Sequence, residues 1–313
     1  MSSASDEEHA ARQDRAMSFP DVPGGVVVVD KPAGMTSHDV VSRLRRLLSI
    51  RRIGHAGTLD PMATGVLVCG VARATKLLGH LPLEPKVYLA TVRLGVSTST
   101  DDADGECTGG IDASAVSEPA ILAGIADLSG AIEQVPSSVS AVKVGGRRAY
   151  TLARAGEQVT LAARPVNVSR FELLTLRRGA AVTDLDVLVE CSGGTYVRAL
   201  ARDLGAALGV GGHLIALRRT RVGPFEVSRA HTLDELVARP NLSMQLDEVV
   251  AAAFQHRAVD ATQARILSHG GGLPAVGLAG THAAIDSEGH AVALLAERAG
   301  QARPVLVLRP AGG

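Results

Sequence analysis

The sequence predicts an α+β fold: a largely antiparallel mixed sheet with flanking helices, followed by a small C-terminal β domain. The strand-like segments outnumber the crossovers that a wholly parallel sheet would need, and no Gly-rich fingerprint of a βαβ unit follows any of them. From about Leu242 onward the chain changes to short strands, Gly-rich turns and little helix. A separate β-rich module is therefore expected after the main sheet.

The composition is that of a folded protein with an aliphatic core. Its 313 residues suffice for two domains. Hydrophobic residues make up 46% and charged residues 20%, which excludes wholesale disorder. Because the chain has four Phe, three Tyr and no Trp, its core must consist mainly of Val, Leu, Ile and Ala. Any tyrosine in a cleft is then a candidate for function.

The first expected elements are a strand and a capped helix. Residues 25–30 (GVVVVD) are a β-branched run typical of a buried strand, which a turn at 31–34 ends. Thr36, followed three residues later by Asp39, resembles a capping box, and apolar residues then recur at helical spacing as far as Leu48. A helix is therefore expected directly after the first strand.

The rest of the chain alternates between irregular segments, strands and helices. The segment 54–65 (GHAGTLDPMATG) is too rich in Gly and Pro for a regular element. Residues 166–176 and 182–191 alternate like the strands of an antiparallel pair, and 195–208 predict a helix with one apolar face. The remaining expected elements are strands at 66–71, 88–94, 222–227, 283–286, 291–296 and 305–309, and helices at 118–128 and 245–254.

The sequence predicts neither a membrane span nor a secretory signal. Its longest apolar runs are far shorter than the roughly 18 residues of a membrane helix. The N-terminal residues are polar and net acidic, so 1–23 are expected to form a disordered tail. Three well-separated cysteines argue against a disulfide framework and favour a reducing cytoplasm: Cys69, Cys107 and Cys191.

The charges are segregated along the chain, although the net charge is zero. Segments 30–80, 140–180 and 192–231 together hold 22 basic and 7 acidic residues, a net charge of +15, so the remainder carries −15. This pattern suggests a basic face for a nucleic acid, opposed by an acidic surface. Solvated helix faces explain the same distribution equally well, so charge alone does not decide between them.

One carboxylate in segment 54–65 is a candidate for chemistry. Asp60 lies between glycines and precedes Pro61, which biases it toward extended backbone and places it on a stiff loop. An ordinary Asp-Pro turn is the favoured explanation when the loop is taken alone. His55, five residues earlier, is equally explained as a hydrogen-bonded loop histidine.

Cofactor and metal motifs are missing from the sequence. No Gly-x-Ser-x-Gly motif, His-x-x-x-His pair or ligand-like carboxylate cluster occurs. Residues 101–104 resemble the start of a calcium loop, but its twelfth position is Asp112 instead of a bidentate Glu. We therefore expect no metal and no other cofactor.

Six segments, in order, closely resemble the bacterial TruB family of tRNA pseudouridine synthases. The resemblance spans about residues 24–235, and six motifs in register make a chance match negligible. The matching segments are GVVVVDKPAGMTSHDVV (25–41), GHAGTLDPMATGVL (54–67), DADGE (102–106), PSSVSAVKVGGRRAY (136–150), CSGGTYVRALARDLG (191–205) and HLIALRRTRVGPF (213–225).

The resemblance implies a reaction and its nucleophile. The family isomerises uridine 55 in the T-loop of tRNA to pseudouridine, after the base has been flipped out. Asp60 matches the family's catalytic aspartate. A carboxylate can add covalently to the ribose or to the base while the base rotates, and the sequence does not choose between these two.

The resemblance also implies roles for other residues. Tyr88 matches a tyrosine that can stack on the flipped base and assist proton transfer, and Arg198 matches an arginine that pairs with the catalytic carboxylate. The alternative for Tyr88 is a core or edge-strand tyrosine, which the scarcity of tyrosine in this chain disfavours. For Arg198 a solvated helical arginine is the favoured explanation without the resemblance. Further matches are Tyr196 and Leu217 as pocket lining, Lys31 and Pro32 as support beneath the site, and His55 as the residue that enters the T-loop. Lys76, Arg147 and Arg148 are candidate phosphate contacts, and solvated basic side chains explain them equally well.

The implied organisation is a tail (1–23), a pseudouridine synthase domain (24–240) and a short PUA-like RNA-binding domain (241–313). The expected partner is tRNA, bound through its T-arm and, by the C-terminal domain, its acceptor stem, with no membrane and no obligate protein partner. Val139 departs from the family, because many members have an aromatic residue there. The rival interpretations are an RNA chaperone without catalysis, a metal-dependent nuclease, and a related enzyme that works with a guide RNA.

Overall fold

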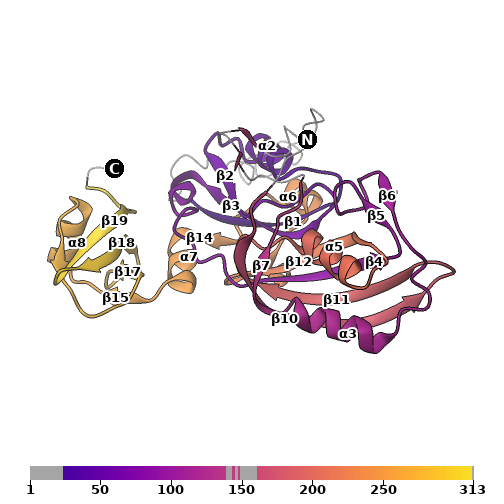
Figure 1. The fold of residues 1–313 in the computed structure, drawn as a ribbon. Helices are drawn as coiled ribbons and strands as arrows, with labels where there is room; N and C mark the ends of the chain where they lie inside the picture. The colour runs from indigo at the N-terminus through magenta and orange to yellow at the C-terminus, as the bar shows by residue number, and fades with distance from the viewer. Residues whose placement is uncertain (1–23, 139–142, 145–146, 149–160, 312–313) are drawn as a thin grey trace, which may run out of the picture.

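The computed structural model describes residues 24–138, 143–144, 147–148 and 161–311. A large mixed sheet occupies one part of the molecule and a smaller sheet lies to one side of it, with a short helix, α7, between them (Figure 1). Both sheets are dominated by antiparallel pairs, as the sequence predicts. Among the described residues, no helix has both the length and the apolar character needed to cross a membrane.

The large sheet has ten strands in the described chain, with the order β14-β1-β3-β12-β4-β11-β10-β7; off this path, β2 pairs with β3 and β13 pairs with β12. Neighbouring strands within this sheet are antiparallel, except for β12 and β3, which run parallel to each other. The strands are β1 (Gly25–Lys31), β2 (Ile53–Ala56), β3 (Thr64–Val71), β4 (Lys86–Leu94), β7 (Gly130–Gln134), β10 (Arg164–Arg178), β11 (Thr183–Cys191), β12 (Gly212–Val222), β13 (Phe225–Glu226) and β14 (Met244–Gln245).

The burial of each strand follows its sequence pattern. Every second residue of β11 is buried, because only one face of this part of the sheet is covered. By contrast, β1 and β3 are almost wholly buried, since both of their faces are packed. Their continuous Val-rich runs are what a doubly covered strand requires.

Helices cover one face of the large sheet and form the larger core with it. Thr36 caps α2 (Ser37–Leu48) in a capping box with Asp39, as predicted. The apolar faces of α2 and α5 (Val197–Ala207) pack on the sheet, and α3 (Glu118–Asp127) and α6 (Leu233–Ala238) extend this layer.

The opposite face of β1 and β3 packs against α7 (Leu246–Ala253) and the smaller sheet, and together they form a second core. Asp247 of α7 accepts from Arg309 at 2.7 Å, and Arg73 donates to the carbonyl of Leu308 at 3.1 Å. The smaller sheet has the order β15-β17-β18-β19-β16. Its elements are β15 (His256–Ala258), α8 (Ala261–Ser268), β16 (Leu273–Pro274), β17 (Thr281–Ile285), β18 (Ala291–Arg298) and β19 (Gln301–Val307).

Short elements complete the described chain. They are η2 (Ala72–Lys76), β5 (Ser97–Thr98), β6 (Cys107–Gly109), β8 (Lys143–Val144), β9 (Arg147–Arg148) and η3 (Val227–Arg229).

Several elements differ from the sequence predictions, and of strand β12 only the last residue, Val222, was predicted as strand. The segment 54–65 is not wholly irregular, because its first residues belong to β2 and its last to β3. The expected strand at 222–227 is the end of β12, then β13 and a 3-10 turn. The helix α8 was not expected, since it buries only Leu267 fully and shows no apolar stripe. Strand β19 begins four residues earlier than predicted.

Candidate active site

A cavity opens where the loop after β2 meets β4, β12 and the start of α5. Its volume is about 190 Å³. Pockets for drug-sized ligands measure roughly 300–1,000 Å³, so this cavity suits a single ring-sized group. The lining includes Lys86, Arg219 and residues 57–59, 194, 195 and 197. Five predicted site residues complete it: Asp60, Tyr88, Tyr196, Arg198 and Leu217.

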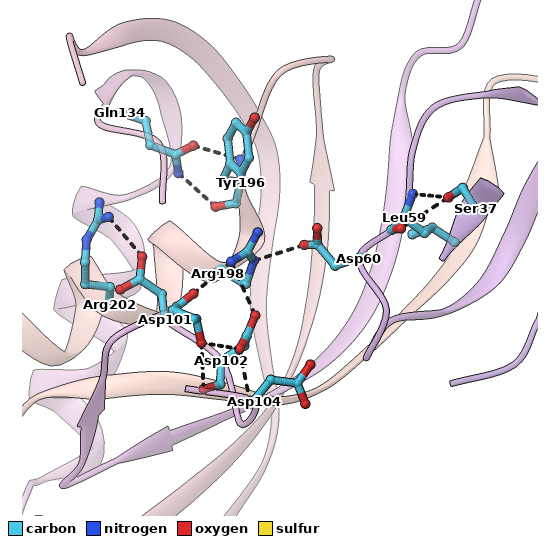
Figure 2. Close-up of polar contacts among 11 residues, drawn as sticks. Ser37, Leu59, Asp60, Asp101, Asp102, Asp104, Gln134, Tyr196, Arg198 and Arg202 are labelled. Carbon is cyan, nitrogen blue, oxygen red and sulfur yellow. Dashed lines mark hydrogen bonds and ion pairs between the residues drawn. The ribbon is translucent and has the colours of Figure 1, made fainter. Parts of the chain in front are cut away.

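Arg198 lies between two carboxylates at the edge of this cavity (Figure 2). Its Nε is 2.9 Å from Asp60 Oδ2, and its Nη1 is 3.3 Å from Asp102 Oδ2 and donates to the carbonyl of Thr100 at 2.8 Å. The side chain of Arg198 is 3% exposed and that of Asp102 7%, whereas Asp60 is 39% exposed. The predicted Asp60–Arg198 pair therefore forms, and its carboxylate faces outward.

Three elements anchor the loop that carries Asp60. The hydroxyl of Ser37, at the start of α2, accepts from the amide of Leu59 at 3.0 Å and donates to its carbonyl at 3.2 Å (Figure 2). Arg219 of β12 donates to the carbonyl of Gly57 at 2.6 Å. Beyond Asp60, the carbonyl of Pro61 accepts from the Lys31 ammonium at 3.1 Å. The position of Asp60 is thus determined from both sides.

Lys31 is a fully buried cation beneath this loop. Its Nζ also donates to the carbonyls of Pro32, at 2.8 Å, and Met35, at 2.7 Å, so three backbone oxygens share its three protons. Burial lowers the pKa of Lys31 to about 8, although the nearby charge of Asp60 acts in the opposite direction. The structure accordingly places Lys31 under the site and not in the cavity lining.

Tyr88 and Arg219 face each other across two neighbouring strands. They are paired in the register of β4 and β12, and both line the cavity. Burial raises the pKa of Tyr88, and the charge of Arg219 together with a hydrogen bond from it lowers that pKa. Arg219 is 1% exposed, and its Nε donates to the carbonyl of Val66 at 2.8 Å.

A buried amide holds the residue that begins α5. Gln134 of β7 accepts from the Tyr196 amide at 2.8 Å and donates to its carbonyl at 3.1 Å (Figure 2). Tyr196 is the N-cap residue of α5, so this pair of bonds fixes the point where the helix starts. Arg198, two residues on, projects from the first turn, as predicted.

The other predicted site residues lie outside the cavity lining. His55 is on β2, half-buried, with its ring centroid 6.0 Å from that of His38 in an edge-on contact, and burial lowers its pKa. Lys76 ends η2 on the surface. For Arg147 and Arg148 the structure describes a short backbone strand, and Val139 lies outside the described residues.

Five residues of the site were not predicted from the sequence and contribute a side chain to it: Ser37, Lys86, Asp102, Gln134 and Arg219. Asp102 was considered only for a calcium loop, although it belongs to one of the six matching motifs, DADGE. Arg219 belongs to another of them, in a stretch whose three arginines look solvated. In the described part of the chain, no group of three or more His, Cys, Asp or Glu residues is arranged to hold a metal ion.

Family models match most of the chain. "TruB family pseudouridylate synthase (N terminal domain)" covers residues 45–197, "tRNA pseudouridylate synthase B C-terminal domain" covers 198–254, and "tRNA Pseudouridine synthase II, C terminal" covers 254–309.

Curated relatives match at high identity. A tRNA pseudouridine synthase B of Nocardia farcinica is 61% identical over 92% of this chain and 94% of its own length. The protein of that name in Mycobacterium tuberculosis is 58% identical over 92% of this chain and 96% of its own.

Solved structures support the same fold. A Cbf5–Nop10–Gar1 complex contains a chain that matches with a TM-score of 0.70 at 26% identity, over 91% of this chain and 85% of that one. An archaeal box H/ACA Nop10–Cbf5 complex matches with a TM-score of 0.69 at 26% identity, over 96% and 90%. These matches confirm the predicted α+β fold. With relatives so similar over nearly its whole length, the chain belongs to the TruB family of pseudouridine synthases.

Proposed function

We propose that this chain isomerises uridine 55 in the T-loop of tRNA to pseudouridine, with Asp60 as the nucleophile. Membership of the TruB family makes it a pseudouridine synthase, and the relatives it resembles are named for tRNA. The observation that carries the residue assignment is a solvent-accessible carboxylate, bound on one oxygen by a buried guanidinium, at the edge of a ring-sized cavity.

The reaction exchanges one bond to the ribose for another. The bond from C1′ to N1 of uracil breaks and a bond from C1′ to C5 forms, while C5 loses a proton and N1 gains one, so no electron donor or acceptor is needed. Arg198 engages Oδ2 of Asp60, and we assign Oδ1 as the attacking atom. Attack at the ribose and attack at the base both fit this arrangement.

The second carboxylate supports a covalent intermediate. Once Asp60 has formed an ester, its negative charge is gone, and a buried arginine whose counter-charge is lost is strongly destabilising. Asp102 remains 3.3 Å from Arg198 and still balances its charge. The pair of carboxylates therefore lets Asp60 change its charge without leaving the guanidinium uncompensated.

The substrate must bring its base out of the loop to reach this cavity. Tyr88, Tyr196 and Leu217 line the space that the flipped base would occupy. We assign His55 to the T-loop at the point where the base leaves. Lys76, Arg147 and Arg148 are proposed phosphate contacts to the T-arm, and the PUA-like domain at 241–313 is proposed to reach the acceptor stem, with 24–240 as the catalytic domain.

An unmodified tRNA transcript tests the proposal. Incubation with the protein, followed by mapping of pseudouridine at single-nucleotide resolution, should give one new pseudouridine, at position 55. Modification at another site would overturn the target assignment. Binding without any modification, under conditions where a known relative is active, would favour an RNA chaperone.

A further inference from the structure

Among the residues that the structure describes, Arg219 is the largest fully buried side chain, and it lies beside the proposed nucleophile loop. Its backbone is held close to β3, since it pairs in parallel with Gly65, where an added Cβ would lie 2.1 Å from the carbonyl oxygen of Arg219. No side chain larger than hydrogen fits at that point, so the two strands approach closely. The guanidinium is consequently projected from a fixed base into the cavity wall.

The guanidinium joins three parts of the site in one rigid plane. Its Nε donates to Val66 of β3 at 2.8 Å and its Nη2 to Gly57 at 2.6 Å, three residues before Asp60. Its cross-strand partner is Tyr88, and side chains paired across antiparallel strands lie about 4.5–5.5 Å apart at Cβ. One side chain therefore binds the Asp60 loop and stands opposite Tyr88 on the neighbouring strand.

The chemistry of arginine also determines the polarity of the phenol. Arg219 and Tyr88 are cross-strand partners that both line the cavity, and a guanidinium has five N–H donors and no acceptor, so in a hydrogen bond between them the Tyr88 oxygen must accept. The single phenolic proton then points away from Arg219, toward the cavity. A lysine would supply the same charge but not the planar fork that holds the carbonyls of Gly57 and Val66 at once and leaves further donors for the phenol.

We propose that Arg219 is a positioning residue that couples the Asp60 loop to Tyr88 and orients the Tyr88 hydroxyl as a donor into the cavity. The inference rests on the proposed function for its kinetic test. If it is correct, Arg219 affects the rate of isomerisation by orienting Tyr88, and it has little effect on the affinity for RNA.

A double-mutant cycle on a T-arm hairpin tests it. Arg219→Lys should lower the single-turnover rate of pseudouridine formation by ~10–100-fold, while the Kd for the hairpin changes less than ~3-fold. In a Tyr88→Phe background the same substitution should cost less than ~3-fold in rate, because the group it positions is gone. Equal losses in both backgrounds, or a wild-type rate for Arg219→Lys, would overturn the proposal.

The neighbouring arginine supplies a matched control. Arg218, on the same strand, does not line the cavity and forms an ion pair with Asp30 at 2.7 Å. Arg218→Lys makes the same chemical change one residue away and should retain the wild-type rate. If it slowed the reaction as much as Arg219→Lys, the effect would belong to the strand and the proposal would fail.

A spectroscopic measurement needs neither turnover nor an Arg219 variant. In ¹⁵N-arginine spectra of the full-length chain, slowly exchanging Nε–H signals report buried guanidinium groups, and at least one should shift in Tyr88→Phe. If no signal shifted, the proposed contact between Arg219 and Tyr88 would be refuted. This conclusion would hold even if Arg219→Lys did not fold or Tyr88→Phe were inactive. Absence of pseudouridine with the wild-type chain would instead refute the proposed function, and the spectra would still decide the contact.

Discussion

The charges around Arg198 illustrate what single residues contribute to this site. From the sequence alone, removing the charge of Asp60 would be expected to strip Arg198 of its counter-charge and to threaten the fold. The structure adds Asp102, 3.3 Å from the same guanidinium and 7% exposed. The charge of buried Arg198 is thus balanced by two carboxylates, Asp60 and Asp102. Neutralising the more exposed one, Asp60, still leaves Arg198 with a buried counter-charge.

Asp60→Asn should therefore abolish catalysis and leave the fold intact. Asparagine keeps the size of the side chain but cannot act as an anionic nucleophile, so single-turnover pseudouridine formation should fall below detection. Affinity for tRNA should change far less, because it is expected to come mainly from phosphate contacts and base stacking, in which the Asp60 carboxylate takes no part. Isomerisation near the wild-type rate in this variant would show that Asp60 is only a turn residue. Thermal melting verifies the fold.

Asp102→Asn should be the more damaging change for stability. It removes the more buried of the two carboxylates that balance Arg198, while Asp60 still pairs with that arginine at 2.9 Å, so the cost should stay below the roughly 3–5 kcal/mol of a buried charge left without any partner. Denaturant unfolding of the variant should show this partial loss, with a lower rate of isomerisation. Asp101→Asn is a suitable control, because Asp101 pairs with the more exposed Arg202 at 3.1 Å. Equal losses for both variants would contradict a special role for Asp102.

Lys31 should make stability depend on pH in the alkaline range. Its pKa is about 8 in the folded chain, against 10.5 for an ordinary lysine, so between these values the unfolded chain binds more protons. Stability conferred by Lys31 should therefore rise as pH increases through this window. The contribution of Lys31 is the difference in unfolding free energy between the wild type and Lys31→Met, measured by denaturant unfolding at pH 7.5, 9 and 10.5. A stability difference that stays constant with pH would contradict the lowered pKa.

At the scale of elements, the predictability of the fold depended on how each strand is buried. The alternation in 182–191 and the Val-rich runs of β1 and β3 reveal strands because their buried side chains are apolar. By contrast, β12 went unrecognised although it lies near the middle of the sheet, since Arg219 is buried on it. Its charge is accommodated by the carbonyls of Gly57 and Val66, partners that lie over 150 positions away in the sequence.

The site was predictable to the extent that its residues lie in local motifs. The capping box of α2 and the stiff loop around Asp60 can be recognised from adjacent residues. Ser37 could not be, because its two bonds to Leu59 exist only once the start of α2 lies against the loop. Contacts of Gln134 with Tyr196 are likewise products of the assembled sheet.

Ser37→Ala should loosen the Asp60 loop while α2 remains folded. The substitution leaves the buried amide of Leu59 without its acceptor, at a cost of about 1–3 kcal/mol in unfolding free energy. The rate of isomerisation should fall several-fold, because Asp60 is the next residue. Ser42, exposed on the same helix, offers the control Ser42→Ala, which should change neither quantity. An unaltered rate in a destabilised Ser37→Ala would show that the loop is held adequately by its other contacts.

At the scale of the whole molecule, the segregated charges predict how RNA binds. If the three basic segments form one surface, binding of tRNA releases counterions from each neutralised phosphate. The affinity should then fall by roughly 10³–10⁵ between 50 and 200 mM salt if about 6–10 phosphates are contacted. Filter binding or fluorescence titration across that range measures the slope. An affinity that is flat with salt would contradict a common basic face.

The pairing of β1 with distant residues has a consequence for the synthesis of the chain. The amide of Val28 donates to the hydroxyl of Ser243, 215 residues later, and Gly25 and Val26 pair with β14. At 5–20 residues per second, a ribosome needs roughly 10–40 s to make this stretch. Throughout that time the outer edge of β1 cannot be closed by β14, and an open edge invites pairing with other chains. Nascent chains stalled before residue 243 should therefore aggregate on release far more readily than chains released after residue 254.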